Sequence, residues 1–165
     1  MDPRHRTKRI AITGHRGLPG ATSALIGAAI RAEVGGRAAG GGLVGLSCVA
    51  DGADTLFAMA VLEHGGALHV IVPARRYRDG LPEDHHATYD ALIARASRVV
   101  TLDHVVSDAG AHMDASLRML ADADELLAVW DGRPARGYGG TADVVHAARE
   151  KGIPVTVVWP AGAVR

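Results

Sequence analysis

The sequence has few aromatic residues, a single cysteine and no excess of charge of either sign, and each of these features limits what the protein can be. Aromatic residues make up 4% of the 165 residues, so the core must be built from Ala, Val, Leu and Ile. Cys48 is the only cysteine, which excludes a disulfide framework and a cysteine-based zinc site. Eighteen basic residues balance eighteen acidic ones, so the chain lacks the broad positive field that drives non-specific nucleic-acid binding.

Long hydrophobic runs are also missing. No stretch approaches the roughly eighteen uninterrupted apolar residues that span a bilayer, and the N-terminus lacks the apolar segment of a secretory signal. With the single cysteine, this predicts a cytoplasmic protein that does not enter a membrane. A hydrophobic content of 48% is enough for one well-buried core but not for two ordinary domains. We expect one domain over residues 1–165, with residues 1–8 as a flexible lead-in.

Apolar runs alternate with segments of helical periodicity along the chain. Strands are expected at residues 8–13, 43–49, 69–72, 99–102, 125–130 and 153–159. Helices are expected at residues 23–33, 55–63, 82–96, 111–121 and 144–151. This alternation predicts an α/β fold, a single Rossmann-like, doubly wound parallel sheet with helices on both faces. In such sheets ligands bind beyond the carboxyl ends of the strands, where the strand order reverses.

The central feature is the glycine cluster Arg136–Asp143, which lies between an expected strand and an expected helix. Gly139 and Gly140 would bring backbone N–H groups to a phosphate, and Thr141 could donate its hydroxyl. The alternative is that the glycines only form a sharp turn before the helix, with Thr141 as the N-cap of that helix. A second glycine-rich stretch, Gly35–Gly42, follows a helix and not a strand, so we expect it to be a flexible connector.

Two more loops are expected at the same edge of the sheet. The candidate ligand-binding residues there are Gly14, His15 and Arg16 after the first strand, Asp51, Gly52 and Asp54 after the second, and Asp131 and Gly132 after the fifth. These residues offer donors for an anion and carboxylates for sugar hydroxyls, which fits a nucleotide or a phosphorylated ribose. The alternative for Arg16 is a solvated charge on a loop. The alternative for Asp54 is a cap of the following helix, and for Asp54 the sequence favours the cap over ligand binding.

Asp143 is the candidate catalytic residue. It lies in the first turn of its expected helix, where a carboxylate also stabilises the helix dipole. In N-glycosidic cleavage it would stabilise positive charge on ribose or orient a water molecule. Adjacent histidines such as His85 and His86 point about 100° apart on a helix, so we expect an exposed polar face there, with no metal and no cofactor. Arg75–Arg78 is expected at the surface or at an interface.

With these loops in place, the chain resembles the SLOG superfamily, which groups the DNA-processing Smf proteins with the Lonely guy phosphoribohydrolases. The resemblance rests on Ile12–Arg16, Asp51–Asp54, Ala128–Gly132 and Gly139–Asp143. It implies a Rossmann-like sheet, a homodimer, and glycine loops that bind nucleotides or their derivatives.

The sequence departs from the Lonely guy pattern at two positions. Those enzymes place a glutamate three residues after the threonine of the glycine motif and an arginine on the preceding helix. Here Val144 and Ala115 stand at these positions. The resemblance therefore implies nucleotide binding more strongly than it implies hydrolysis.

Three hypotheses for the function follow. The first is hydrolysis of a nucleoside 5′-monophosphate to free base and ribose 5-phosphate. The second is a ligand sensor without catalysis, which Val144 and Ala115 favour. The third is an NAD-dependent oxidoreductase, but the spacing of Gly14, Gly17 and Gly20 does not match the G-x-G-x-x-G fingerprint.

Overall fold

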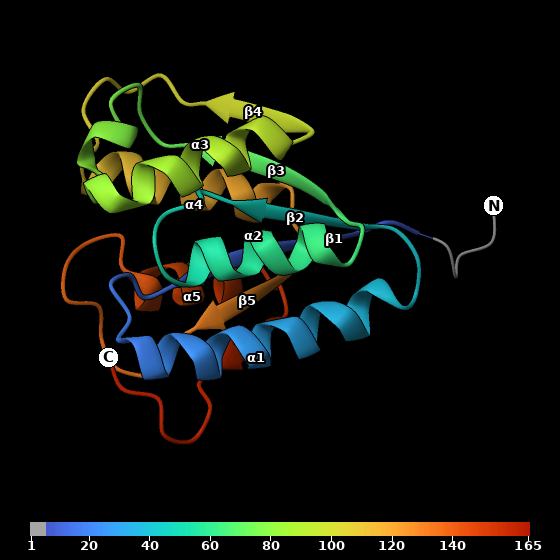
Figure 1. The fold of residues 1–165 in the computed structure, drawn as a ribbon. Coiled ribbons are helices and arrows are strands. Elements are labelled where there is room, and N and C mark those ends of the chain that lie inside the picture. Colours follow the sequence, from blue (N-terminus) through green and yellow to red (C-terminus); the bar gives the residue numbers. More distant parts are fainter. Residues whose placement is uncertain (1–5) are drawn as a thin grey trace.

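The computed structural model describes residues 6–165, which form a parallel six-stranded sheet covered by helices (Figure 1). The strands are β1 (Lys8–Gly14), β2 (Leu43–Ser47), β3 (Ala67–Val72), β4 (Arg98–Thr101), β5 (Glu125–Val129) and β6 (Val155–Val158). The helices are α1 (Gly20–Ala38), α2 (Ala53–Glu63), α3 (His86–Arg95), α4 (Ala109–Ala121) and α5 (Thr141–Glu150). Two 3-10 turns, η2 (Arg78–Gly80) and η3 (Glu83–His85), precede α3.

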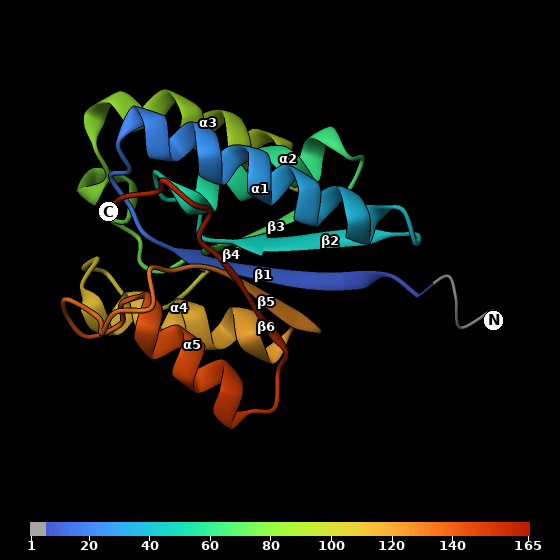
Figure 2. The ribbon, with the colours of Figure 1, turned by 90° about the horizontal axis from the view of Figure 1, so that it is seen from below.

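The strand order places the point of reversal between β1 and β5. The order is β4-β3-β2-β1-β5-β6, and all neighbouring strands pair in parallel. Figure 2 shows α1, α2 and α3 on one face of the sheet and α4 and α5 on the other. This confirms the predicted α/β doubly wound fold. The carboxyl ends of β1 and β5, where Gly14 is paired with Val129, form the position at which such sheets bind ligands.

The central strand β1 is buried on both faces. Ile10 and Ile12 belong to a core cluster with Phe57 of α2, whereas Ala11 belongs to the opposite cluster with Val144 of α5. All five side chains are buried. Successive side chains of a strand point to opposite faces, so a strand covered on both sides needs an unbroken apolar run. The apolar run therefore explains why β1 is a central strand of the sheet. The polar loop after β1 extends from this central position.

Helix α1 is longer than predicted. The sequence around Gly35–Gly42 was expected to be a flexible connector, but α1 continues to Ala38, so the first half of that prediction is wrong. Val34 is buried, and the Arg37 guanidinium lies 2.7 Å from a carboxylate oxygen of Glu125 and 2.6 Å from one of Glu33. These contacts outweigh the low helix propensity of the glycines. Only residues 39–42 connect α1 to β2.

The predicted lead-in over residues 1–8 lies mostly outside the described part of the chain, which begins at residue 6. Lys8 is already the first residue of β1. Among the helices of residues 6–165, none has the length and apolar character needed to cross a membrane.

Candidate functional site

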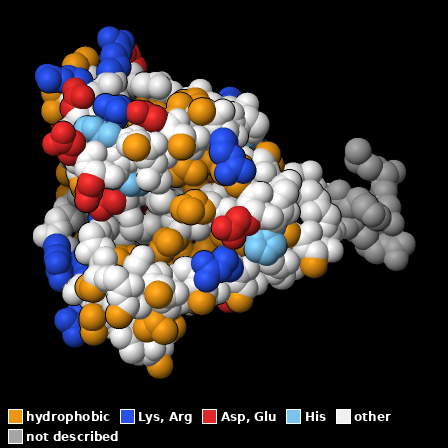
Figure 3. Space-filling view, viewed as in Figure 1, with side chains coloured by type: hydrophobic (Ala, Val, Ile, Leu, Met, Phe, Trp, Pro, Cys, Tyr) orange, Lys and Arg blue, Asp and Glu red, His pale blue; other side chains and the backbone are white. Residues whose placement is uncertain are grey.

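A pocket of about 240 Å³ opens beyond the carboxyl ends of the central strands. Charged side chains gather on the same edge of the molecule, at the left in Figure 3. The residues that line the pocket come from the end of β1, from the loops after β1, β2, β3 and β5, from the first turns of α2 and α5, from α4 and from the segment after β6: Ile12, Thr13, Gly14, His15, Arg16, Cys48, Ala50, Asp54, Pro73, Tyr77, His112, Ser116, Met119, Gly139, Gly140, Thr141 and Arg165.

The structure brings seven of the proposed site residues to this pocket: Gly14, His15, Arg16, Asp54, Gly139, Gly140 and Thr141. Three of the others support pocket residues from behind. Asp51 binds Arg16, Asp131 contacts His15, and Asp143 binds the turn at Gly139. Gly52 caps α2, and Gly132 follows Asp131 on the loop after β5. Neither glycine lines the pocket.

His15 orients Thr141 through a hydrogen-bonded chain. The backbone N–H of Asp131 donates to His15 Nε2 at 3.3 Å, so the neutral ring carries its proton on Nδ1. Nδ1 lies 3.5 Å from the hydroxyl oxygen of Thr141 and donates toward it. Burial lowers the pKa of His15, and the charge of Arg165 lowers it further, which keeps the ring neutral. The Thr141 hydroxyl therefore retains its own proton for donation into the pocket.

Arg16 is held in place by Asp51. Its Nε and Nη2 atoms lie 2.9 and 2.8 Å from the same carboxylate oxygen of Asp51, and the other oxygen accepts the N–H of Gly17 at 3.1 Å. The Arg16 side chain is 43% exposed and lines the pocket. This arrangement directs a fixed positive charge to the pocket and occupies the Asp51 carboxylate.

Asp54 presents a carboxylate to the pocket with little support from the protein. Within residues 6–165 its oxygens have one hydrogen bond, a long one of 3.4 Å from the N–H of Ala50, and no ion pair. Burial raises the pKa of Asp54 to about 7, although the Ala50 N–H and Arg16 oppose the increase. The expectation that Asp54 caps α2 is wrong, because the N-cap is Gly52, with φ at 88°. Asp54 therefore titrates near neutrality inside the pocket.

The glycine turn before α5 is held together by its own contacts. Gly140 is the N-cap of α5, so the alternative role of Thr141 as the N-cap is wrong. The Gly139 N–H donates to the Asp143 carboxylate at 2.9 Å. A Cβ on Gly139 would lie 3.0 Å from the carbonyl oxygen of Ala109, and one on Gly140 would lie 2.9 Å from Ala135 Cβ. Both glycines are required by the packing of the turn itself.

The other wall of the pocket was not found from the sequence. His112, Ser116 and Met119 line it from α4, and their spacing of four and three residues places them on one helix face. The Tyr77 ring packs edge-on against His112 at 5.8 Å between centroids. Its hydroxyl has no hydrogen-bond partner in the described part of the chain, so it is available to a ligand. The helical spacing was the signal that could have revealed this wall.

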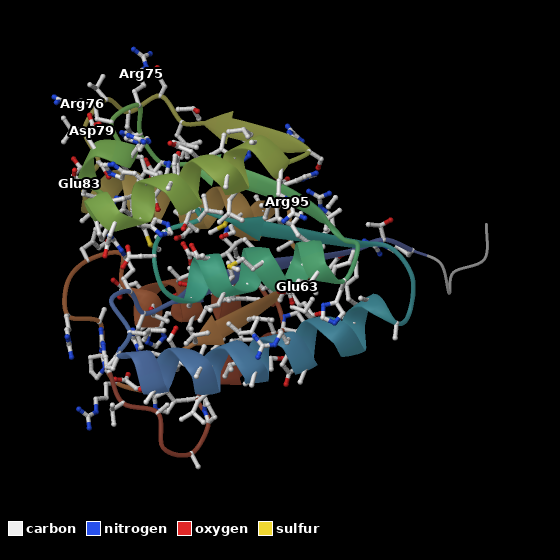
Figure 4. All side chains as sticks on the ribbon, in the orientation of Figure 1. Glu63, Arg75, Arg76, Asp79, Glu83 and Arg95 are labelled. Carbon is white, nitrogen blue, oxygen red and sulfur yellow. The ribbon has the colours of Figure 1, made fainter. Side chains whose placement is uncertain are left out.

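Two histidines and three arginines outside the pocket were also assigned from the sequence. The exposed face expected at His85 is wrong, because this ring is buried and its Nε2 lies 3.0 Å from the carbonyl oxygen of Val49. Arg75, Arg76 and Arg78 form ion pairs with Asp103, Asp79 and Asp90 at the surface. Figure 4 shows Arg75 and Arg76 pointing away from the body of the molecule. None of the three arginines lines the pocket.

Comparison with known proteins identifies the fold. No protein-family model and no curated protein matches the chain. DNA processing protein A from Streptococcus pneumoniae matches with a TM-score of 0.69 and 16% identity, over 94% of this chain and 52% of that one. DNA processing protein A from Helicobacter pylori, described for its single-stranded DNA binding mode, matches with a TM-score of 0.66 and 15% identity, over 94% and 67% of the two chains.

A third match is the molybdenum cofactor carrier protein from Chlamydomonas reinhardtii, with a TM-score of 0.55 and 15% identity over 93% of this chain and 76% of that one. The shared feature is the Rossmann-like fold. It is also the fold that the resemblance to the SLOG superfamily implies. The chain spans about half the length of the Streptococcus protein.

Proposed function

We propose that the pocket binds a small phosphorylated molecule, a nucleotide or a nucleotide derivative. The observation that carries the proposal is the convergence of the α5 N-terminus, the free Thr141 hydroxyl and the Arg16 guanidinium on one pocket. Each of these groups favours an anion. The pocket volume, 240 Å³, is slightly below the roughly 300–1,000 Å³ of sites for drug-sized molecules, which suits a sugar phosphate or a mononucleotide.

The fold and the sequence motifs support the same proposal. We propose that the chain is a SLOG-type Rossmann-like protein, because the motif Ile12–Arg16, at the end of β1, and the motif Gly139–Asp143, at the start of α5, both contribute residues to the pocket. Among its structural neighbours, one protein carries the molybdenum cofactor and another binds single-stranded DNA. We infer a free ligand and not a polynucleotide because the chain has no excess of basic residues. The homodimer that the resemblance implies stays a prediction.

Replacing Thr141 by valine is expected to weaken the binding of ribose 5-phosphate and of nucleoside monophosphates about five- to tenfold. Valine keeps the branched shape but removes the hydroxyl that would bind the phosphate, and a hydrogen bond to a charged group contributes about 1.5 kcal/mol at the lower end of its usual range. Isothermal titration calorimetry measures the change. Thr101→Val, an exposed position on β4, is the matched control and should bind as the wild type does. Equal affinity in both variants would remove Thr141 from the site.

Hydrolysis of a nucleoside 5′-monophosphate is the second candidate function. Water would add its oxygen to the anomeric carbon as the bond to the base nitrogen breaks, and the base would leave with a proton. Asp54 favours this candidate because a carboxylate that titrates near neutrality can transfer a proton at physiological pH. Val144 and Ala115 oppose it, because both are buried in the core.

Chromatography of reactions with purine and pyrimidine monophosphates would detect the free base that this candidate predicts. If Asp143 has the catalytic role predicted from the sequence, Asp143→Asn abolishes turnover, whereas binding is preserved because the asparagine oxygen can still accept the N–H of Gly139. Equal turnover in this variant would show that Asp143, which does not line the pocket, only supports the turn. Asp54→Asn tests the second carboxylate in the same assay. If the bound nucleotide is recovered intact from wild-type protein, the hydrolase is excluded and the sensor hypothesis stands.

A further inference from the structure

A second hollow, of about 350 Å³, lies beside the pocket at the same edge of the sheet. Its lining comprises Asp131, Arg133, Arg136, Trp159, Ala163, Val164 and Arg165. Arg165 lines both the hollow and the pocket, so the two spaces adjoin at this side chain. Figure 1 shows the chain ending on the same side of the molecule as the loop between β5 and α5.

The hollow has more positive charge than the protein neutralises. Three guanidinium groups face a single side-chain carboxylate, that of Asp131, which lies 3.5 Å from Arg165 Nη1. Within residues 6–165, the side chains of Arg133 and Arg136 have no hydrogen bond and no ion pair. Elsewhere on the surface, Arg75, Arg76 and Arg78 each have an aspartate partner. Unpaired arginines beside a phosphate site suit another anionic group.

The backbone around the hollow is fixed by hydrogen bonds. The Asp131 carboxylate accepts the N–H of Arg133 at 3.0 Å, and the Trp130 indole N–H donates to the carbonyl oxygen of Arg133 at 2.8 Å. On the other side, the Val164 N–H donates to the Thr22 hydroxyl at 3.0 Å. Arg133 and Arg165 therefore extend from anchored backbone, which reduces the entropy lost when they bind a ligand.

The charge of the hollow also reaches the pocket. Burial lowers the pKa of His15, and the charges of Arg165 and Arg136 lower it further. His15 in turn contacts Thr141, the proposed phosphate donor. Because Arg165 lines both spaces, an anion in the hollow can belong to the same ligand as a phosphate at Thr141.

We propose that Arg133 and Arg136 bind a second phosphate of the ligand, so that the site selects a nucleoside di- or triphosphate over a monophosphate. This inference rests on the proposed function. The pocket holds one phosphate at Thr141 and the α5 N-terminus, and the hollow binds the next phosphate across Arg165. A monophosphate leaves the hollow empty and gains nothing from Arg133 and Arg136.

Calorimetric titration with the mono-, di- and triphosphates of adenosine, guanosine, cytidine and uridine, in the presence of EDTA, tests the proposal. For the best-bound base, the dissociation constant should fall at least about tenfold from mono- to diphosphate, because a bidentate arginine–phosphate contact is strong. The variant Arg133→Ala/Arg136→Ala should bind the diphosphate no more tightly than the monophosphate. Its affinity for the monophosphate should equal that of the wild type.

Arg95→Ala is the matched control, because it removes an arginine from the end of α3, away from the carboxyl edge of the sheet (Figure 4). It should keep the preference for the diphosphate. Equal affinity for mono- and diphosphates in the wild type, or a preference that survives in the double variant, would overturn the proposal. Tighter binding of a short single-stranded oligonucleotide than of any triphosphate would also overturn it, in favour of nucleic acid. Failure of every phosphorylated probe to bind would instead refute the proposed function.

Discussion

Replacing Asp54 by asparagine is expected to raise the free energy of unfolding by about 2–4 kcal/mol at pH 8 and to leave it nearly unchanged at pH 4. Burial raises the pKa of Asp54 to about 7 in the folded protein, against an ordinary value of about 3.9 in an unfolded chain. Between these values the folded state binds more protons than the unfolded state. The stability contributed by this group therefore falls as the pH rises from about 4 to about 7, and stays low above that.

Asparagine has nearly the same shape as aspartate and cannot ionise, so the variant lacks the dependence of stability on pH that Asp54 causes. The difference in unfolding free energy between variant and wild type should grow through the same pH window and then level off. Urea denaturation at half-unit pH steps measures it. Asp103→Asn is the control, because its side chain is 94% exposed, and its effect should stay within about 0.5 kcal/mol. A loss of stability in Asp54→Asn at pH 8 would show that the carboxylate stabilises the fold when ionised.

A carboxylate that destabilises the fold at neutral pH needs an explanation outside folding. Asp51 and Asp131, on neighbouring loops, have an arginine partner, whereas in the described part of the chain Asp54 has only the long hydrogen bond from Ala50. Strongly perturbed titration in a pocket is typical of functional residues. Besides Thr141, Asp54 is therefore a group that we expect to contact the ligand.

The fold could be predicted from the sequence because its apolar runs and its helical segments indicate the same architecture. The apolar run of β1 requires cover on both faces, and the helices between strands supply that cover. The loops after β1, β2 and β5 could be placed together because parallel strands end at one edge. His112 and Ser116 could not be placed in this way, because they come from α4, a helix that packs on one face of the sheet (Figure 2). Arg165 reaches the pocket only through the packing of the segment after β6, where the Val164 N–H bonds to Thr22.

The role of the glycines was harder to predict, because a glycine pattern does not reveal what faces the missing side chain. At Gly139 and Gly140 the nearest atoms belong to Ala109 and Ala135, and both backbone N–H groups already donate within the turn, to the Asp143 carboxylate and to the Gly137 carbonyl oxygen, so these two glycines meet a packing requirement. Gly35 was assigned to a connector although it lies in α1. In both places the tertiary contacts determine the local structure, and these are not visible in a short sequence window.

Replacing Gly14 by alanine is expected to reduce the free energy of unfolding by about 3 kcal/mol or more. The added Cβ would lie 2.5 Å from Ala53 Cβ and 2.7 Å from Val129 Cβ. Both neighbouring atoms are attached directly to backbone, in α2 and in β5, so neither can rotate away. The strain can be relieved only if α2 or β5 moves, which would also displace Asp54 in α2 and the neighbouring His15 in the loop after β1.

Urea denaturation of Gly14→Ala and of the control Gly20→Ala measures the effect. A Cβ on Gly20, at the start of α1, meets no atom within 4 Å, so that variant should be as stable as the wild type or slightly more stable. Unchanged stability in Gly14→Ala would show that α2 and β5 can separate without cost. The absence of a side chain at Gly14 would then be explained by ligand binding. A large loss would show that the glycine at the end of β1 serves first to bring three loops close enough together to form one site.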